Sequence, residues 1–218
     1  DEFSHWLPAA RFLFEADGFP RAGDVFTGLS AYPYGWPILM YLGGRAAGHY
    51  LDNIGGPLNI LMLTTFGVFV LRTAFAVAGK PRGDLIGWPF AAAAALVASA
   101  FNPTFVQKIV LTAYSDVSGS VATGVAILVG YIWLERLAGR AQTSSLGGAW
   151  QFSLALALLI NIRQTNLVIA LAILLAVALI AWRDADIDLA RFLRQLPLVV
   201  VAPAALYLVW RWYVAYPL

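Results

Sequence analysis

Polar residues suited to chemistry are gathered in three short stretches of an otherwise apolar chain. These stretches are 1–5 (Asp-Glu-Phe-Ser-His), 114–116 (Tyr-Ser-Asp) and 163–166 (Arg-Gln-Thr-Asn). Together they offer carboxylates, one imidazole and one guanidinium. A carboxylate can take a proton from a hydroxyl group, and a guanidinium presents a planar fork to phosphate oxygens. This combination suits the transfer of a group from a phosphate-linked donor to a hydroxyl acceptor.

Each stretch also has a purely structural interpretation. Asp116 precedes an apolar helix and could cap its N-terminus. Arg163 lies near the end of an apolar run and could reach the membrane surface as an interfacial charge. Asp1 and Glu2 could simply be solvated. Asp1 and His5 share a helical face, but Asp-Glu-x-x-His lacks the first histidine of the zinc-protease pattern, so no metal site is predicted.

The composition places these residues in a membrane protein. Of the 218 residues, 61% are hydrophobic, 12% are charged and none is cysteine, whereas about 25% of a soluble domain is charged. The mean hydropathy is +0.74. These values exclude a soluble domain, a disordered tail and a disulfide scaffold. The basic residues are scattered in short connections, so nucleic acid is not expected as a partner.

We predict an all-α fold, a polytopic bundle of transmembrane helices, because a spanning helix needs about 20 mostly apolar residues. About six spans are expected, over residues 57–78, 85–101, 117–138, 150–162, 167–182 and 196–214. Residues 1–56 form a separate first loop with short amphipathic helices at the interface, one of them over 38–47. Residues 57–218 form the transmembrane region. The chain is expected to be a fragment, open at both ends.

The charges of the connections predict the orientation of the spans. Every second connection carries basic residues, which are Lys80, Arg82, Arg136, Arg140, Arg183, Arg191 and Arg194. By the positive-inside rule, those connections face the cytoplasm. The first loop, Asp116 and Arg163 then lie on the periplasmic or lumenal side.

The predicted span 150–162 is short, at about 20 Å against a hydrocarbon core of about 30 Å. The polar turn 163–166 is therefore expected below the outer surface. Polar backbone at that depth is tolerated only within protein or beside a water-filled cavity. We expect an outward-facing cavity in which the three polar stretches meet.

At these stretches the sequence resembles the GT-C glycosyltransferases, polytopic enzymes that use polyprenyl-phosphate-linked sugars. Within them it is most similar to the dolichyl-phosphate-glucose alpha-1,2-glucosyltransferase family. That family has an Asp-Glu-x-x-His stretch, a Tyr-Thr-Asp segment followed by small residues, and an Arg-Gln-Thr-Asn turn. Residues 1–5, 114–116 and 163–166 match these in order, with Ser115 in place of the threonine. The alanine-rich, cysteine-free composition points to a bacterial relative.

The resemblance implies an inverting transfer on the outer side of the membrane. Asp1 would be the general base on the acceptor hydroxyl, and Glu2 and His5 would position the Asp1 carboxylate. Asp1, Glu2 and Asp116 would be the catalytic residues. Asp116 would bind the acceptor or help to orient that base.

The resemblance also implies which residues hold the substrates. Arg163 and Gln164 would bind the donor phosphate, while Tyr114 and Asn166 would help to position the substrates. The partners would be a polyprenyl-phosphate sugar, a lipid-linked or cell-envelope glycan acceptor and the lipid bilayer. No cofactor is predicted, although some enzymes of this class use a divalent metal between carboxylates.

The expected location is the bacterial inner membrane, with the active site facing the periplasm, or the endoplasmic reticulum membrane in a eukaryote. A transporter or channel is the main alternative, with Asp116 and Arg163 lining the substrate path. A lipid-embedded scaffold subunit is a third, in which all the polar stretches would tolerate alanine.

Overall fold

The structure is a computed structural model in which residues 5–21, 23–24, 32–79, 87–100, 114–140 and 143–215 are described. Every regular element within these ranges is a helix. The chain divides into two compact units. The first comprises Asp1–Gly18 and Pro37–Val121, and the second comprises Phe19–Trp36 and Ala122–Leu218.

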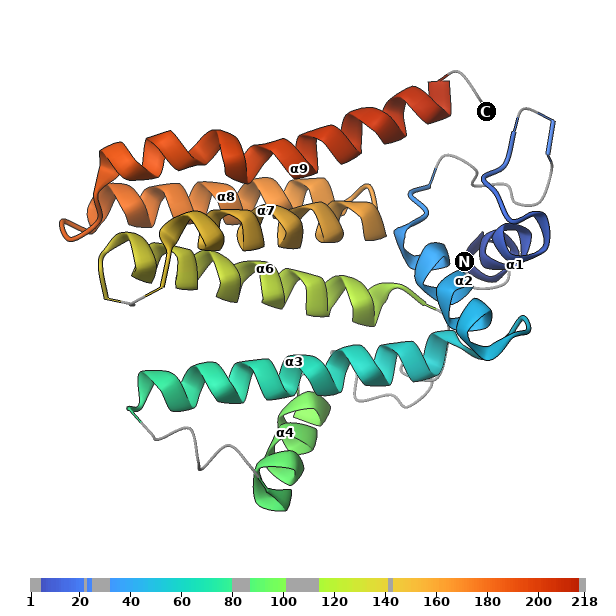
Figure 1. Cartoon of the computed structure of the whole chain (residues 1–218), viewed down its shortest axis with the longest axis horizontal. Coiled ribbons are helices and arrows are strands. Elements are labelled where there is room, and N and C mark those ends of the chain that lie inside the picture. Colours follow the sequence, from blue (N-terminus) through green and yellow to red (C-terminus); the bar gives the residue numbers. More distant parts are fainter. Residues whose placement is uncertain are drawn as a thin grey trace. The chain divides into compact units, whose positions relative to one another are not determined.

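The described helices account for the apolar runs of the sequence. They are α1 (Leu7–Ala16), α2 (Gly35–Ala47), α3 (Gly55–Val77), α4 (Trp88–Ala100), α6 (Asp116–Leu137), α7 (Ser145–Ile162), α8 (Asn166–Arg183) and α9 (Leu189–Ala215). Among these described helices, α3, α6, α7, α8 and α9 are long and apolar enough to cross a membrane (Figure 1). The fold is that of a multi-pass helical membrane protein, as the composition predicts.

The predicted short span 150–162 is wrong. Helix α7 begins at Ser145 and has 18 residues, a length of about 27 Å that nearly matches a core of about 30 Å. The length of α7 therefore gives no reason to place the turn after it below the membrane surface. The predicted span began too late because Gly147 and Gly148 are poor helix formers. Gly148 is used for packing, since a Cβ there would lie 3.1 Å from Cδ1 of Trp133.

Two other boundaries differ from the prediction. Helix α9 begins at Leu189, seven residues before the predicted start at 196, because Asp188 accepts a hydrogen bond from the backbone N–H of Arg191 at 3.0 Å and caps the helix. The predicted span 85–101 corresponds to α4, which has 13 residues. The residues next to α4, 80–86 and 101–113, lie outside the described ranges, so a sixth span stays a prediction.

In the first unit, part of the loop before the spans is folded into helices. The helix predicted over 38–47 is confirmed as α2, and α1 precedes it. Beyond the end of α1, Asp17 accepts a hydrogen bond from the Tyr41 hydroxyl at 2.7 Å. Arg45 lies 3.5 Å from the same carboxylate. These contacts join the end of α1 to α2.

Helices α3 and α4 of the first unit pack through small residues (Figure 1). A Cβ on Gly67 would collide with the carbonyl oxygen of Ala94 and lie 3.2 Å from the backbone nitrogen of Ala98. In lipid, helices associate through close packing rather than a hydrophobic driving force. Gly67 is therefore the position at which this pair approaches most tightly among the described glycines.

In the second unit, α7, α8, α9 and most of α6 lie side by side (Figure 1). Trp133 is fully buried and its ring lies 5.1 Å from that of Phe192 and 5.8 Å from that of Phe152. Its indole N–H donates to Oε1 of Gln195 at 2.9 Å, and Nε2 of Gln195 donates to Ser145 Oγ at 2.9 Å. This chain of hydrogen bonds joins α6, α9 and α7 inside the bundle.

One end of the second unit is tied by ion pairs. Arg140 lies 3.1 Å from Glu135, 3.0 Å from Asp184 and 2.6 Å from Asp186. The α6–α7 and α8–α9 connections therefore meet at the same end, as the alternating basic residues predict. The turn between α7 and α8 lies at the other end of α7.

The sidedness of these ends can be measured with single cysteines, because the chain has no native cysteine. Ser144 and Thr165 are both exposed and lie at opposite ends of α7. In right-side-out vesicles, we expect a membrane-impermeant maleimide to label Thr165→Cys and to spare Ser144→Cys until the membrane is permeabilised. Labelling of both variants, or of Ser144→Cys alone, would contradict the predicted orientation.

Candidate functional site

The polar turn 163–166 joins α7 to α8 at one end of the second unit. Helix α7 ends at Ile162, and Arg163 follows in an extended conformation with φ −149° and ψ 142°. Asn166 is buried, and its Nδ2 donates to the carbonyl oxygen of Leu159 at 3.0 Å. That bond satisfies a carbonyl of the last turn of α7. The hydrogen bond therefore joins the first residue of α8 to the last turn of α7. Gln164, between the two helices, is exposed.

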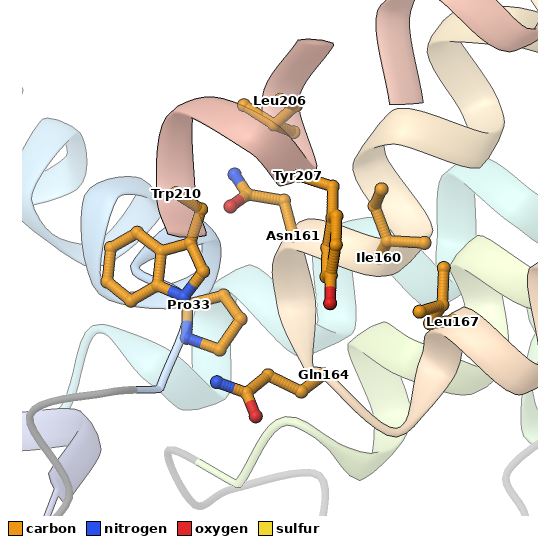
Figure 2. A pocket seen from close by; sticks show the side chains of 8 residues that line it. All are labelled: Pro33, Ile160, Asn161, Gln164, Leu167, Leu206, Tyr207 and Trp210. Carbon is orange, nitrogen blue, oxygen red and sulfur yellow. The ribbon is translucent and has the colours of Figure 1, made fainter. Parts of the chain in front are cut away.

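A small pocket lies beside this turn. Its lining residues are Pro33, Ile160, Asn161, Gln164, Leu167, Leu206, Tyr207 and Trp210. Figure 2 shows the amides of Asn161 and Gln164 together with the rings of Tyr207 and Trp210 around it. The pocket thus combines hydrogen-bonding amides with aromatic surface.

The aromatic rings of the pocket come from the last turns of α9, beyond Pro203. A proline inside a helix removes one backbone hydrogen bond and bends the helix. The backbone N–H of Ala202 donates to Ser153 Oγ at 3.4 Å, and Ser153 is buried in α7. This contact holds the proline-containing part of α9 against α7, next to the turn.

A segment of the first loop packs on the same part of α9. The Tyr34 ring lies 5.3 Å from Trp210 and 5.7 Å from Phe19. The Phe19 ring lies 5.8 Å from Tyr213, whose hydroxyl donates to the carbonyl oxygen of Pro20. Each aromatic pair contributes about 0.5–1.5 kcal/mol beyond the area it buries. The cluster therefore holds Phe19, Pro20 and Tyr34 against α9, next to Pro33 of the pocket.

Gly35 allows this segment to approach α7 closely. A Cβ at Gly35 would lie 2.5 Å from the carbonyl oxygen of Asn161 and 2.8 Å from its Nδ2. No side chain can occupy that space without moving the backbone. The absence of a side chain at residue 35 is therefore part of how the pocket wall is built.

The predicted residues at the start of the chain are described only in part. Asp1 and Glu2 lie outside the described residues. His5 is fully buried, and its ring lies 4.5 Å from that of Trp6. Burial lowers the pKa of His5 to about 4, so its imidazole is neutral at neutral pH.

Tyr114 and Asp116 lie at the start of α6, in the first unit. The carbonyl oxygen of Tyr114 accepts a hydrogen bond from Nδ2 of Asn59 at 3.3 Å, and Asn59 is buried in α3. The Ser118 hydroxyl donates to the carbonyl oxygen of Ser115 at 2.9 Å. Asp116 is the first residue of α6 and half-buried, where the helix dipole favours a carboxylate.

The predicted site residues are divided between the two units. His5, Tyr114 and Asp116 belong to the first unit, whereas Arg163, Gln164 and Asn166 belong to the second. The meeting of the three polar stretches in one cavity stays a prediction. Within the part of the chain that the structure describes, no group of three or more His, Cys, Asp or Glu residues is placed to hold a metal ion.

Some pocket residues were missed by sequence reasoning. Tyr207 and Trp210 fell within the predicted span 196–214 and were not singled out, although aromatic residues recur there every third residue, at 207, 210 and 213. Such spacing places them on one side of a helix. Pro33 was not assigned to the site, since its place in the pocket depends on tertiary packing.

Comparison of the chain with family models, curated proteins and solved structures gives no match. The functional argument therefore rests on the residues and on the geometry of the turn and its pocket.

Proposed function

We propose that this chain carries the site of an integral-membrane glycosyltransferase, which moves a sugar from a polyprenyl-phosphate donor to an acceptor hydroxyl on the periplasmic or lumenal side. The observation that supports it is the turn 163–166 at one end of a membrane bundle, beside a pocket of amides and aromatic rings. The order of the polar stretches, which resembles that of the GT-C enzymes, adds to this support.

The position of Arg163 suits the phosphate of a lipid-linked donor. Helix α7 is about 27 Å long and so reaches from one headgroup layer to near the other. The phosphate of a polyprenyl lipid lies at the level of the headgroups, as would a residue at the end of such a helix. A guanidinium binds phosphate oxygens through two parallel hydrogen bonds and retains its charge as the phosphate leaves.

The pocket beside Arg163 has the side chains that a sugar needs. The rings of Tyr207 and Trp210 offer apolar surface to the ring faces of a sugar. The amides of Asn161 and Gln164 offer both donors and acceptors to its hydroxyl groups. Tyr207 and Gln164 are exposed, so a ligand can reach them from outside the bundle.

The proposed reaction is a single displacement at the anomeric carbon of the sugar. The acceptor oxygen forms the new bond to that carbon while the bond to the phosphate oxygen breaks, and the configuration inverts. The acceptor proton passes to the carboxylate of Asp1, and the phosphate leaves with the bonding electrons beside Arg163. Positioning and charge stabilisation provide most of the acceleration in such a site.

The test is a transfer assay with the full-length protein in proteoliposomes. It uses a panel of radiolabelled polyprenyl-phosphate sugars, with membrane lipid extract as the source of acceptor. Wild type should transfer one sugar. Arg163→Ala should lower the rate by about 100-fold or more, the usual loss when a charge-stabilising group is removed. Asp116→Asn should lower the rate as well, because the carboxylate that binds the acceptor or orients the base is lost. Arg211→Gln is the matched control, since Arg211 is exposed on α9, and should retain the wild-type rate.

Other outcomes would reject parts of the proposal. Transfer that survives both substitutions would reject this site while keeping the class of enzyme. If folded wild type transfers no sugar from any donor, and Asp116 and Arg163 variants change substrate flux across the vesicle membrane, the chain is a transporter.

A further inference from the structure

The opposite end of the second unit carries exposed arginines that the proposed reaction does not use. Arg183 ends α8, and Arg191 and Arg194 lie in the first two turns of α9. All three are exposed. Arg191 and Arg194 are three residues apart, so they share one side of the helix.

The carboxylates at this end bind groups other than these three guanidinium groups. Arg140 alone pairs with Glu135, Asp184 and Asp186. A backbone hydrogen bond from Asp186 and the hydrogen bond from Arg140 lower the pKa of Asp184, so that carboxylate stays charged and bound. Asp188 accepts the backbone N–H of Arg191 at 3.0 Å.

The three arginines take no part in the ion pairs that the structure describes at this end. Across the described ranges of the chain, none of the ion pairs involves Arg183, Arg191 or Arg194. Glu135, Asp184 and Asp186 pair with Arg140, whereas Arg183, Arg191 and Arg194 are exposed and can bind an external anion.

Helix lengths place these arginines in the headgroup layer. Helix α9 has 27 residues, a length of about 40 Å that exceeds the hydrocarbon core by about 10 Å. Its first turns then extend beyond the core. Trp182 next to Arg183 is 74% exposed, and exposed tryptophan is typical of the membrane interface. Leu189 and Leu193 are exposed beside the arginines, as suits a surface that also meets acyl chains.

We propose that Arg183, Arg191 and Arg194 form a docking surface for anionic phospholipids, with phosphatidylglycerol as the representative headgroup. Each guanidinium can bind phosphate oxygens in a bidentate manner. A basic residue near an anionic membrane surface contributes about a fivefold gain in binding. This surface is independent of the proposed transfer reaction, since it lies at the other end of α7 from the turn 163–166.

The test measures the binding of fluorescent phosphatidylglycerol to the full-length protein in phosphatidylcholine nanodiscs at low salt. The triple variant Arg183→Gln, Arg191→Gln, Arg194→Gln should bind on the order of 100-fold more weakly, if the contributions are additive. The corresponding triple lysine variant should retain most of the binding, because the charge is kept. Added salt should weaken the wild-type interaction.

Arg211→Gln is the matched control, as it removes an exposed arginine at the other end of α9. Its loss of binding should not exceed the share of one basic residue, about fivefold. Equal loss in Arg211→Gln and the triple variant, or no loss in a triple variant with wild-type helicity, would overturn the proposal. Competition by inorganic phosphate at the concentration of the lipid would also overturn it, in favour of a site for a soluble anion.

Discussion

Gly35→Ala should lower the free energy of unfolding of the second unit by about 1–3 kcal/mol, the usual cost of forcing extra atoms into a close-packed site. The new methyl group would lie 2.5 Å from the carbonyl oxygen of Asn161. A backbone oxygen cannot rotate away as a flexible side chain would. The strain can be relieved only if the first-loop segment around residue 35 moves away from α7.

The same change should also disturb the pocket. Pro33 is two residues from the substitution and lines the pocket with Trp210. When the segment moves, the contact of Tyr34 with Trp210 at 5.3 Å is lost as well. We therefore expect the tryptophan fluorescence of Gly35→Ala to differ from that of wild type in a folded sample. The measurement is chemical unfolding in detergent, followed by circular dichroism and fluorescence.

Gly147→Ala is the matched control for this substitution. A Cβ at Gly147 meets nothing within 4 Å, and alanine is the better helix former by about 1 kcal/mol. The control should be as stable as wild type or slightly more stable. If Gly35→Ala unfolds at the same denaturant concentration as Gly147→Ala, the close approach of the loop segment to α7 is refuted.

The sequence predicted the membrane helices best where the apolar run was unbroken. Helix α8 is an example, with a predicted span of 167–182 and observed bounds of Asn166–Arg183. The starts of α7 and α9 were missed for two different reasons. Glycines hid the first turns of α7, whereas Arg191 and Arg194 made the first turns of α9 look like a connection. Hydropathy detects only the part of a helix that lies in the hydrocarbon core, and the starts of α7 and α9 lie at the edge of that core.

The helix α1 shows a second limit of the sequence. Its buried residues Ala9, Ala10 and Leu13 recur with helical spacing, yet they are interleaved with charged residues such as Arg11 and Glu15. A short helix of this kind is stabilised by what it packs against rather than by its own propensity. The sequence shows the pattern without showing the partner.

The candidate site divides in the same way. That the turn 163–166 joins two helices was predictable, because it is a polar stretch between two apolar runs. Its expected depth below the outer surface depended on a short span, which the 18 residues of α7 do not bear out. Its neighbours Tyr207 and Pro33 were not predictable, since they lie far along the chain on either side and reach the turn only through tertiary packing. Local patterns thus pointed to Arg163 and the Gln164 amide but not to the rings of Tyr207 and Trp210.

Gly67→Ala should have a comparable effect on the first unit, with a loss of about 1–3 kcal/mol in the free energy of unfolding. The added methyl group would collide with the carbonyl oxygen of Ala94. Ala94 and Ala98 are the buried residues of α4, so the approach of α4 to α3 depends on small side chains from both helices. Lipid tails pack on an apolar helix as well as another helix does. No hydrophobic force therefore compensates for the loss of close contact between α3 and α4.

Thr64→Ala is the matched control for Gly67→Ala, because Thr64 is exposed in the same helix and its hydroxyl donates within that helix, to the carbonyl oxygen of Ile60 at 2.8 Å. We expect the control to unfold as wild type does. In Gly67→Ala the rings of Phe75 and Phe90, which lie 6.0 Å apart in α3 and α4, should separate, and a cysteine pair at these two positions should cross-link more slowly than in the Gly67 background. Equal cross-linking rates in both backgrounds would show that α3 and α4 do not meet at Gly67, and the packing of this pair would then have to depend on its aromatic contacts instead.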